Sequence, residues 1–434
     1  MTTAEAAAGS TLARPRSRMN STLASRRMER AGPVYRLRSA ALIAVIAVIA
    51  ACSPATPDTT PPGVPISSDH LFVWTAAADS TQPDFLAVLD VRADGDRYGS
   101  IVATLTVPGL RNGPHHTEHE MAGDGFFLAN GFASGQTYIF DLSSPDQPRL
   151  AGQFGDLDGY SHPHSYVRLP NGNVLAAFQM RHDDEGMAPG GLVELTPRGQ
   201  LVRSSSAYGP GSPRGARAYS LVAVPALDRV VSTTSDMDET NPYLARDVQV
   251  WRLSDLTLLH TFALPAGPRG DEADFSAEPR LLGDGRTVVV TTFSCGMYLL
   301  DGLDGDAPSG RLVASFPRSV DCGIPVVSGH HLLITVPSYP AVVSLDISDP
   351  AAPREVDRLM LPDGWVPHWL ALEPGSRRLV LTGYGTMADR VVLLTHDPAT
   401  GALAIDDRFR EEGATMPGVR VTGAPHGAVF GRKQ

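Results

Sequence analysis

The pattern of apolar and polar positions between Tyr160 and Phe178 predicts a β-hairpin. Two runs rich in apolar residues are separated by a Pro-Asn-Gly turn at 170–172. Asn-Gly between two apolar runs is a strong hairpin signal, because both residues tolerate positive φ. Histidines stand at the start of the first run, at His162 and His164.

The same order of elements recurs three more times along the chain. His368 precedes an apolar run, a Pro-Gly turn and a second apolar run. The pair His115 and His116 precedes a Gly-Asp-Gly turn and another apolar run. His426 begins a final copy that the chain end cuts short. Four strands are therefore expected to begin with a histidine.

A second apolar pattern returns seven times and predicts the architecture. Short strands with a polar last residue recur every 45 to 58 residues, ending at Asp90, Asp141, Glu194, Arg252, Asp301, Asp346 and Thr395. A period near fifty with four short strands per unit is typical of a β-propeller. The sequence predicts an all-β, seven-bladed propeller, and no helical stretch is long enough to form a separate domain.

The two ends of the repeat region predict how the ring closes. The unit that ends at Asp90 has His70–Ala77 as its second strand and no first strand before it. The C-terminal run Pro425–Phe430 has the pattern of a first strand and nothing after it. We expect the propeller to occupy residues 70–434 and to close by strand exchange between the C-terminus and the first blade.

The first fifty residues have the pattern of a targeting segment. Arginines precede an unbroken apolar run at 40–51, which is too short to span a bilayer and suits a signal peptide. Small residues before Cys52 and a Pro/Thr-rich stretch after it resemble the lipobox of bacterial lipoproteins. Residues 1–51 are thus predicted as a lipoprotein signal peptide and 52–69 as a tether. The alternative is an ordinary secretory signal with an incidental cysteine.

This segment predicts a location in the cell envelope, facing the periplasm or the outside. The chain would contact the membrane only through lipid on Cys52. Two further cysteines, Cys295 and Cys322, are most simply a disulfide in an exported protein. Metal ligation or a reactive thiol is the alternative for these two residues.

Charge limits the partners that the sequence supports. Without residues 1–51 the chain has 28 basic and 45 acidic side chains, a net charge of about −17. Its only lysine is Lys433, and no basic patch with interleaved aromatic residues is present, which argues against nucleic acid. A monomer that binds a cationic or neutral small molecule is expected.

The recurring histidines predict a metal site. The first strand of each propeller blade lines the central axis, so the proposed ligands His116, His164, His368 and His426 would converge there. Tyr219, Glu278 and Cys322 would occupy the three remaining axial positions. Neutral imidazole nitrogen suits copper, iron and zinc. The alternative is that each histidine is a polar residue satisfied by hydrogen bonds.

Strand alternation refines this set at 115–120. Residues of even number would share one face, placing His116 with Glu118 and Glu120 and turning His115 and His119 away. Glu118, Glu120 and Glu278 are candidates to accept the second N–H of the ligating imidazoles. The sequence assigns no catalytic residue: it contains no nucleophile elbow, phosphate loop or dinucleotide-binding fingerprint.

Several of these stretches resemble the selenium-binding protein family, whose enzymes include methanethiol oxidase. The stretches are the histidine segments at 115–117 and 161–175, Ala-Glu-Pro-Arg-Leu at 277–281, Cys-Gly-Met-Tyr at 295–298, Leu-Asp-Ile-Ser-Asp-Pro at 345–350 and Pro-His at 425–426. The resemblance implies a seven-bladed propeller with histidine-bound copper that oxidises methanethiol to formaldehyde, hydrogen sulfide and hydrogen peroxide.

One departure from the family concerns selenium. Family members often carry Cys-x-x-Cys just after the paired histidines, where this chain has Glu-His-Glu-Met at 118–121. Three function classes follow: a copper oxidase of a small thiol; an iron oxygenase of the carotenoid- and stilbene-cleaving type, which the four-histidine pattern resembles; and a non-catalytic envelope propeller. The thiol oxidase is the preferred hypothesis.

Overall fold

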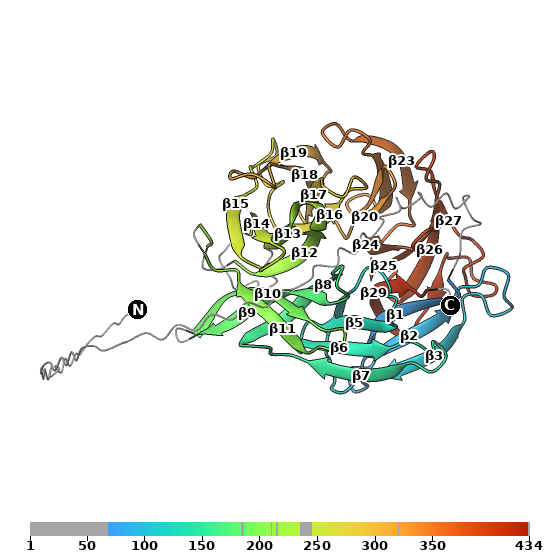
Figure 1. Ribbon diagram of the computed structural model, residues 1–434. Coiled ribbons are helices and arrows are strands. Elements are labelled where there is room, and N and C mark those ends of the chain that lie inside the picture. The colour runs from blue at the N-terminus through green and yellow to red at the C-terminus, as the bar shows by residue number, and fades with distance from the viewer. Residues whose placement is uncertain are drawn as a thin grey trace, which may run out of the picture. The chain divides into compact units, whose positions relative to one another are not determined.

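The structure is a computed structural model that describes residues 68–183, 186–209, 211–213, 216–234, 245–319 and 321–432. The predicted signal peptide, Cys52 and most of the tether lie outside these residues. The described strands form seven antiparallel sheets, which we number as blades 1 to 7 (Figure 1). The predicted seven-bladed β-propeller is confirmed.

The first four blades contain four strands each, which follow one another from the axis outward. Blade 1 comprises β29 (Gly423–Phe430), β1 (His70–Ala77), β2 (Phe85–Asp90) and β3 (Ile101–Thr106). Blade 2 comprises β4 (Pro114–Thr117), β5 (Phe126–Gly131), β6 (Gln136–Asp141) and β7 (Arg149–Phe154). Blade 3 comprises β8 (Tyr160–Arg168), β9 (Val174–Asp183), β10 (Gly186–Leu195) and β11 (Leu201–Ser206). Blade 4 comprises β12 (Ala218–Val224), β13 (Arg229–Thr234), β14 (Asp247–Arg252) and β15 (Leu258–Ala263).

The remaining three blades follow the same order. Blade 5 comprises β16 (Ser276–Leu281), β17 (Val288–Thr292), β18 (Gly296–Asp301) and β19 (Ser309–Ser315). Blade 6 comprises β20 (Val326–Ser328), β21 (His331–Val336), β22 (Ala341–Asp346) and β23 (Arg354–Met360). Blade 7 comprises β24 (Trp365–Leu372), β25 (Arg378–Gly385), β26 (Arg390–His396) and β27 (Leu403–Ile405), with β28 (Val419–Arg420) also paired to β26.

Within the described part of the chain, the only helix is one 3₁₀ turn, η1 (Pro225–Leu227). No helix there is long and apolar enough to cross a membrane.

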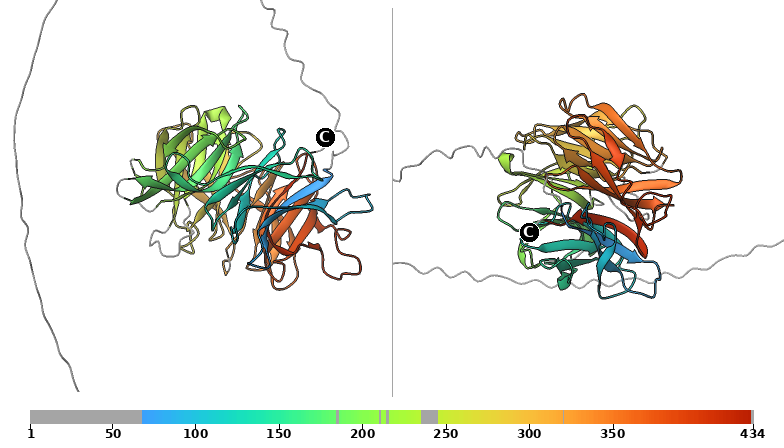
Figure 2. Two further views of the ribbon diagram at one scale, coloured as in Figure 1. Left: turned by 90° about the horizontal axis from the view of Figure 1, so that it is seen from below. Right: turned by 90° about the vertical axis from the view of Figure 1, so that its right-hand side faces the viewer.

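The last strand of the chain belongs to the first blade. β29 pairs with β1 antiparallel, with Phe430 opposite Leu71 and Gly423 opposite Ala77. Their red and blue ribbons lie side by side in both views of Figure 2. β29 also contacts the inner strands β4 and β24 of the blades on either side. The C-terminal strand therefore takes the innermost place in a sheet whose other strands come first in the sequence.

Burial follows from blade packing. Inner and middle strands are covered by a blade on each side, so β17 and β21 are buried along their whole length and β1 is buried from Leu71 to Thr75. Between blades 1 and 7 the apolar core includes Leu71, Trp369, Val391 and Phe430. Outer strands such as β7 alternate exposed and half-buried residues, because only one of their faces packs.

The two ends of the inner strands lie on opposite faces of the propeller. We call the face where the inner strands begin the strand-start face, and the opposite one the strand-end face. Ser68 lies on the strand-end face, because Leu71 at the start of β1 pairs with the end of β29. A buried ion pair of blade 7 holds it there: Arg378 binds Glu373 and donates to the Ser68 carbonyl, while Glu373 accepts the Ser68 N–H.

A buried histidine pair between blades 6 and 7 predicts acid lability. His331 and His396 are 2% and 1% exposed, and their ring centres are 5.1 Å apart. Burial lowers the pKa of His331 and lowers that of His396 to about 4. Both nitrogens of His396 are buried without a hydrogen-bond partner. The surrounding charged or titratable groups are His330, Arg377, Asp346 and Asp397.

Because these pKa values are lower in the folded state, the unfolded chain takes up protons first as the pH falls below about 6.5. Stability should decline between pH 6.5 and 4, by on the order of 2 kcal/mol for His396. We expect the variant His396→Leu to lose less stability than the parent over this range in urea unfolding series. Equal pH slopes for the two proteins would show that His396 is not responsible.

Candidate metal centre

Five imidazoles gather where the inner strands approach the axis. β4 supplies His115 and His116, β8 supplies His164, β24 supplies His368 and β29 supplies His426. Ring centres are 4.2 Å apart for His116 and His164, 4.4 Å for His115 and His426, and 5.0 Å for His368 and His426. The structure thus brings together all four histidines that the repeats single out, and adds His115.

Their nitrogens are close enough to share one ion. One nitrogen each of His115, His116 and His164 lies within 4.8 Å of the other two. Nε2 of His426 is 3.1 Å from Nδ1 of His115. His368 extends this group through its contact with His426. We call these five residues the histidine cluster.

Whether the histidine cluster fits a metal can be judged from its imidazole nitrogens that lack a hydrogen-bond partner. Nε2 of His115, His164 and His368, together with Nδ1 of His426, is buried with no hydrogen-bond partner in the described structure. A buried polar atom without a partner costs free energy, and such atoms are rare in native proteins. A metal ion would take up these lone pairs, and an all-imidazole shell suits copper, iron or zinc. The donor set fits the predicted group.

Burial keeps the cluster neutral. Desolvation, reinforced by the neighbouring imidazoles, lowers the pKa of His115, His116 and His426 well below the usual value. Burial lowers the pKa of His164 to about 3 and that of His368 to about 4. At neutral pH the imidazoles therefore carry no charge, which is the form that ligates metals.

One hydrogen bond sets the tautomer of His164. Its Nδ1 lies 3.0 Å from the carbonyl oxygen of Tyr219. A carbonyl only accepts, so Nδ1 carries the proton and the lone pair of Nε2 remains available. The hydroxyl of Ser165 lies 3.0 Å from this Nδ1 and 3.1 Å from Nδ1 of His116. Hydrogen bonds of this kind orient ligating imidazoles.

Of the three acidic residues proposed to support the ligands, only Glu278 lies beside the cluster. Its Oε1 is 4.0 Å from Nδ1 of His116 and has no hydrogen-bond partner, while Oε2 accepts from Ser220 and Arg280. Burial raises the pKa of Glu278. The carboxylate of Glu118 instead binds Arg168, and Glu120 is exposed.

The prediction that His115 faces away from the axis is wrong. Strand alternation assumes regular pairing, but the register of β4 with β5 shifts between Pro114 and Thr117. This irregularity lets two consecutive residues, His115 and His116, both turn toward the axis. His119 lies outside the cluster, stacked on Trp369, and His162 is half-buried at a positive φ of 56°.

Sequence reasoning missed other residues of the site. Trp369 packs with its ring centre 5.4 Å from that of His116, and Tyr384 lies 5.1 Å from His368. Ser165 and Trp369 each follow a cluster histidine directly in the sequence, which is the signal that could have drawn attention to them. Tyr384 lies sixteen residues beyond His368 on the neighbouring strand β25, and no local pattern marks it.

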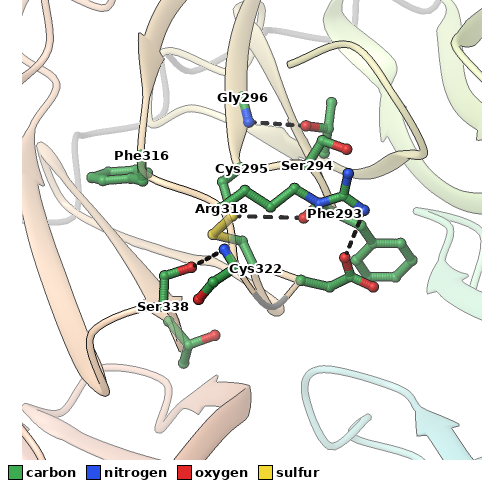
Figure 3. Close-up of a disulfide and its surroundings, with 12 residues drawn as sticks. Phe293, Ser294, Cys295, Gly296, Phe316, Arg318, Cys322 and Ser338 are labelled. Carbon is green, nitrogen blue, oxygen red and sulfur yellow. Dashed lines mark hydrogen bonds and ion pairs between the residues drawn. A yellow bond between two sulfur atoms is a disulfide. The ribbon is translucent and has the colours of Figure 1, made fainter. Parts of the chain in front are cut away.

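Cys295 and Cys322 form a disulfide with Cα atoms 5.2 Å apart. The bond joins the turn between β17 and β18 to the link that leads into blade 6, and both residues are 1% exposed (Figure 3). Cys322 also donates its backbone N–H to the carbonyl of Phe293. In this state neither sulfur is a free thiol or a candidate ligand.

Removing this disulfide should destabilise the propeller. It closes a loop with a sequence separation of 27 residues, for which chain entropy predicts about 3.5 kcal/mol. We expect the double variant Cys295→Ala, Cys322→Ala to unfold at correspondingly lower guanidinium concentration. Reductant should shift the parent protein in the same direction and leave the double variant unchanged. A parent midpoint that is insensitive to reductant would contradict the expectation.

Comparisons with known proteins agree with this architecture. No family model matches the chain. A segment of 139 residues is 31% identical to a methanethiol oxidase of Hyphomicrobium sp. and spans 31% of each chain. The chain therefore resembles the selenium-binding protein and methanethiol oxidase family.

Solved structures support the fold. A hypothetical selenium-binding protein from Sulfolobus tokodaii superposes with a TM-score of 0.66 at 16% identity, over 84% of this chain and 93% of that one. A periplasmic gluconolactonase from Pseudomonas aeruginosa superposes with a TM-score of 0.60 at 17% identity, over 83% of this chain and 98% of that one. At such identities the likeness concerns the propeller fold, while the methanethiol oxidase match covers under a third of that enzyme.

Proposed function

We propose that the protein is an exported copper oxidase that oxidises a small thiol with molecular oxygen. One observation carries the proposal: five imidazoles converge at the propeller axis, four of them buried and that of His368 half-buried, and four present a nitrogen that lacks a hydrogen-bond partner. The match to methanethiol oxidase supports the choice of a thiol as substrate.

The proposed reaction balances with oxygen and water as co-reactants. With methanethiol, the carbon–sulfur bond breaks, the carbon loses two electrons, and water supplies the oxygen atom of the formaldehyde that forms. The sulfur leaves as hydrogen sulfide, and oxygen takes the two electrons and two protons to form hydrogen peroxide. Bound copper would supply affinity for the thiol sulfur and a path for electrons to oxygen.

The protein's own residues would bind the metal and orient its imidazole ligands. His116, His164, His368 and His426 remain the proposed ligands, and the structure favours adding His115. The Tyr219 carbonyl holds the tautomer of His164 that presents Nε2. The carboxylate of Glu278, near His116, would offset positive charge on a metal-bound imidazole, an effect strengthened by its complete burial.

Elemental analysis tests the proposal. Protein purified without added metal should contain copper in stoichiometric amount and release peroxide when methanethiol and oxygen are supplied. Iron without thiol turnover would replace the proposal with an oxygenase of the carotenoid- or stilbene-cleaving type. Absence of any stoichiometric metal would favour a non-catalytic binding propeller.

Export and lipid attachment are part of the proposal and rest on the sequence of residues 1–69. The disulfide between Cys295 and Cys322 fits an oxidising compartment. The variant Cys52→Ala should lose its lipid and appear in the soluble fraction, as followed by metabolic labelling with a fatty acid and by fractionation. A variant that stays labelled and membrane-bound would refute the anchor.

A further inference from the structure

A pocket of about 570 Å³ lies on the strand-end face, below the histidine cluster. It is enclosed by the ends of β8, β12 and β16 and by the loop that follows β4. Its walls are largely apolar, with Met121, Val167, Leu221 and Pro279 among them. The exposed residue Glu120 also lines it, so the pocket reaches solvent. We call it the axial pocket.

Two polar side chains of the axial pocket lie on the side nearest the cluster. Nη2 of Arg280 lies 3.2 Å from Nε2 of His119. The guanidinium can only donate, so Nε2 of His119 accepts this hydrogen bond. On its other side Arg280 donates through Nη1 to Glu278, whose second oxygen is 4.0 Å from His116. Arg280 therefore links the pocket directly to a neighbour of the cluster.

Trp369 lies next to His119. Its ring stacks on His119, with centres 4.7 Å apart and planes within 5°. Trp369 also contacts His116 and His426, with ring centres at 5.4 and 6.0 Å. His119, Arg280 and Trp369 thus form the layer between the axial pocket and the histidine cluster: His119 and Arg280 line the pocket, and Trp369 lies between His119 and the cluster.

We propose that the axial pocket is the chamber through which the thiol reaches the cluster, and that the His119–Arg280–Trp369 layer shifts to admit it. This inference rests on the proposed function and adds a substrate class to it. The volume is much larger than one-carbon methanethiol requires, and most of the wall area is apolar, although charged side chains such as Arg168 and Arg280 also line the pocket. The preferred substrates are therefore alkanethiols of several carbons, bound about fourfold more tightly for each added methylene.

The strand-start face offers the competing route. There Tyr384 is 43% exposed and its ring contacts those of His368 and His426. A thiol that arrived from this side would pass Tyr384 and would not enter the axial pocket. The two routes can be separated by substitutions on opposite faces.

Binding to the metal-free full-length protein tests the pocket independently of copper. In isothermal titration calorimetry, the affinity should rise about fourfold from ethanethiol to propanethiol and again from propanethiol to butanethiol. Filling the pocket through Ala122→Trp, or from another wall through Val222→Trp, should weaken butanethiol binding at least tenfold. The control Ala404→Trp, on the exposed outer strand β27, should bind as the parent does. Equal affinity across the thiols and across all variants would overturn the inference.

Stopped-flow mixing of butanethiol with copper-loaded protein then tests the route. Both pocket-filling variants should slow the spectral change of the copper at least tenfold at unchanged copper content, and His119→Ala should accelerate it. Acceleration by Tyr384→Ala, with no slowing by the pocket variants, would place the route on the strand-start face. A protein that takes up no copper would refute the proposed function, while the calorimetry still decides on the pocket.

Discussion

Deletion of residues 425–434 should abolish both soluble folding and copper binding. The deletion removes most of β29, which is the innermost strand of blade 1 and contacts β4 and β24 on either side. It also removes His426 and the carbonyl of Ala428, which accepts the indole N–H of Trp369. β1 would be left as an unpaired apolar edge, which favours aggregation.

Gel filtration, circular dichroism and elemental analysis of the truncated protein check this expectation. Most of the protein should aggregate, and any soluble fraction should lack copper. Removing only the last two residues is the matched control and should leave size, spectrum and copper content unchanged. A protein without 425–434 that remained monomeric, folded and copper-loaded would show that β29 is dispensable for both.

Single alanine substitutions in the histidine cluster should each lower copper occupancy. Loss of one imidazole removes a metal–ligand bond and leaves the ion under-coordinated. We expect at least a tenfold loss of affinity, because loss of a residue that only hydrogen-bonds to a ligand already costs about 10- to 100-fold. This holds for His116, His164, His368 and His426, and the structure now adds His115. Thiol-dependent peroxide release should fall together with copper content.

His162→Ala is the matched control, because His162 belongs to β8, as His164 does, yet lies outside the cluster. It should retain copper and activity. Copper that survives in His115→Ala but not in the other four variants would restore the four-ligand set expected from the sequence. Full copper content in all five variants would leave the propeller without a metal site at the axis.

The fold could be predicted because its signals are local. Each blade repeats a strand that ends in a polar residue, as at Asp90 and Asp346. The spacing of these strands indicates a propeller, and the number of copies indicates the number of blades. The convergence of the histidines could also be anticipated, since His164 and His368 stand at matching places in their repeats. Their role as metal ligands stays a prediction.

The errors came from contacts between distant segments. Alternation could not place His115, because the irregular pairing of β4 with β5 is decided by the partner strand. Nor could alternation show that the carboxylate of Glu118 forms an ion pair with Arg168, fifty residues further along the chain. Trp369 and Arg280 acquire their place beneath the cluster only when blades 2, 5 and 7 surround one axis.

The ion pair of Arg378 and Glu373 has a consequence for where the protein works. By holding Ser68 beside Gly431, it fixes the first described residue on the strand-end face, where Arg432 lines the axial pocket. The residues from 52 to 68 can span at most about 55 Å. Lipid on Cys52 would then keep the pocket within that distance of the bilayer surface. Alkanethiols partition into hydrocarbon, so the membrane itself would concentrate the substrate beside the chamber that receives it.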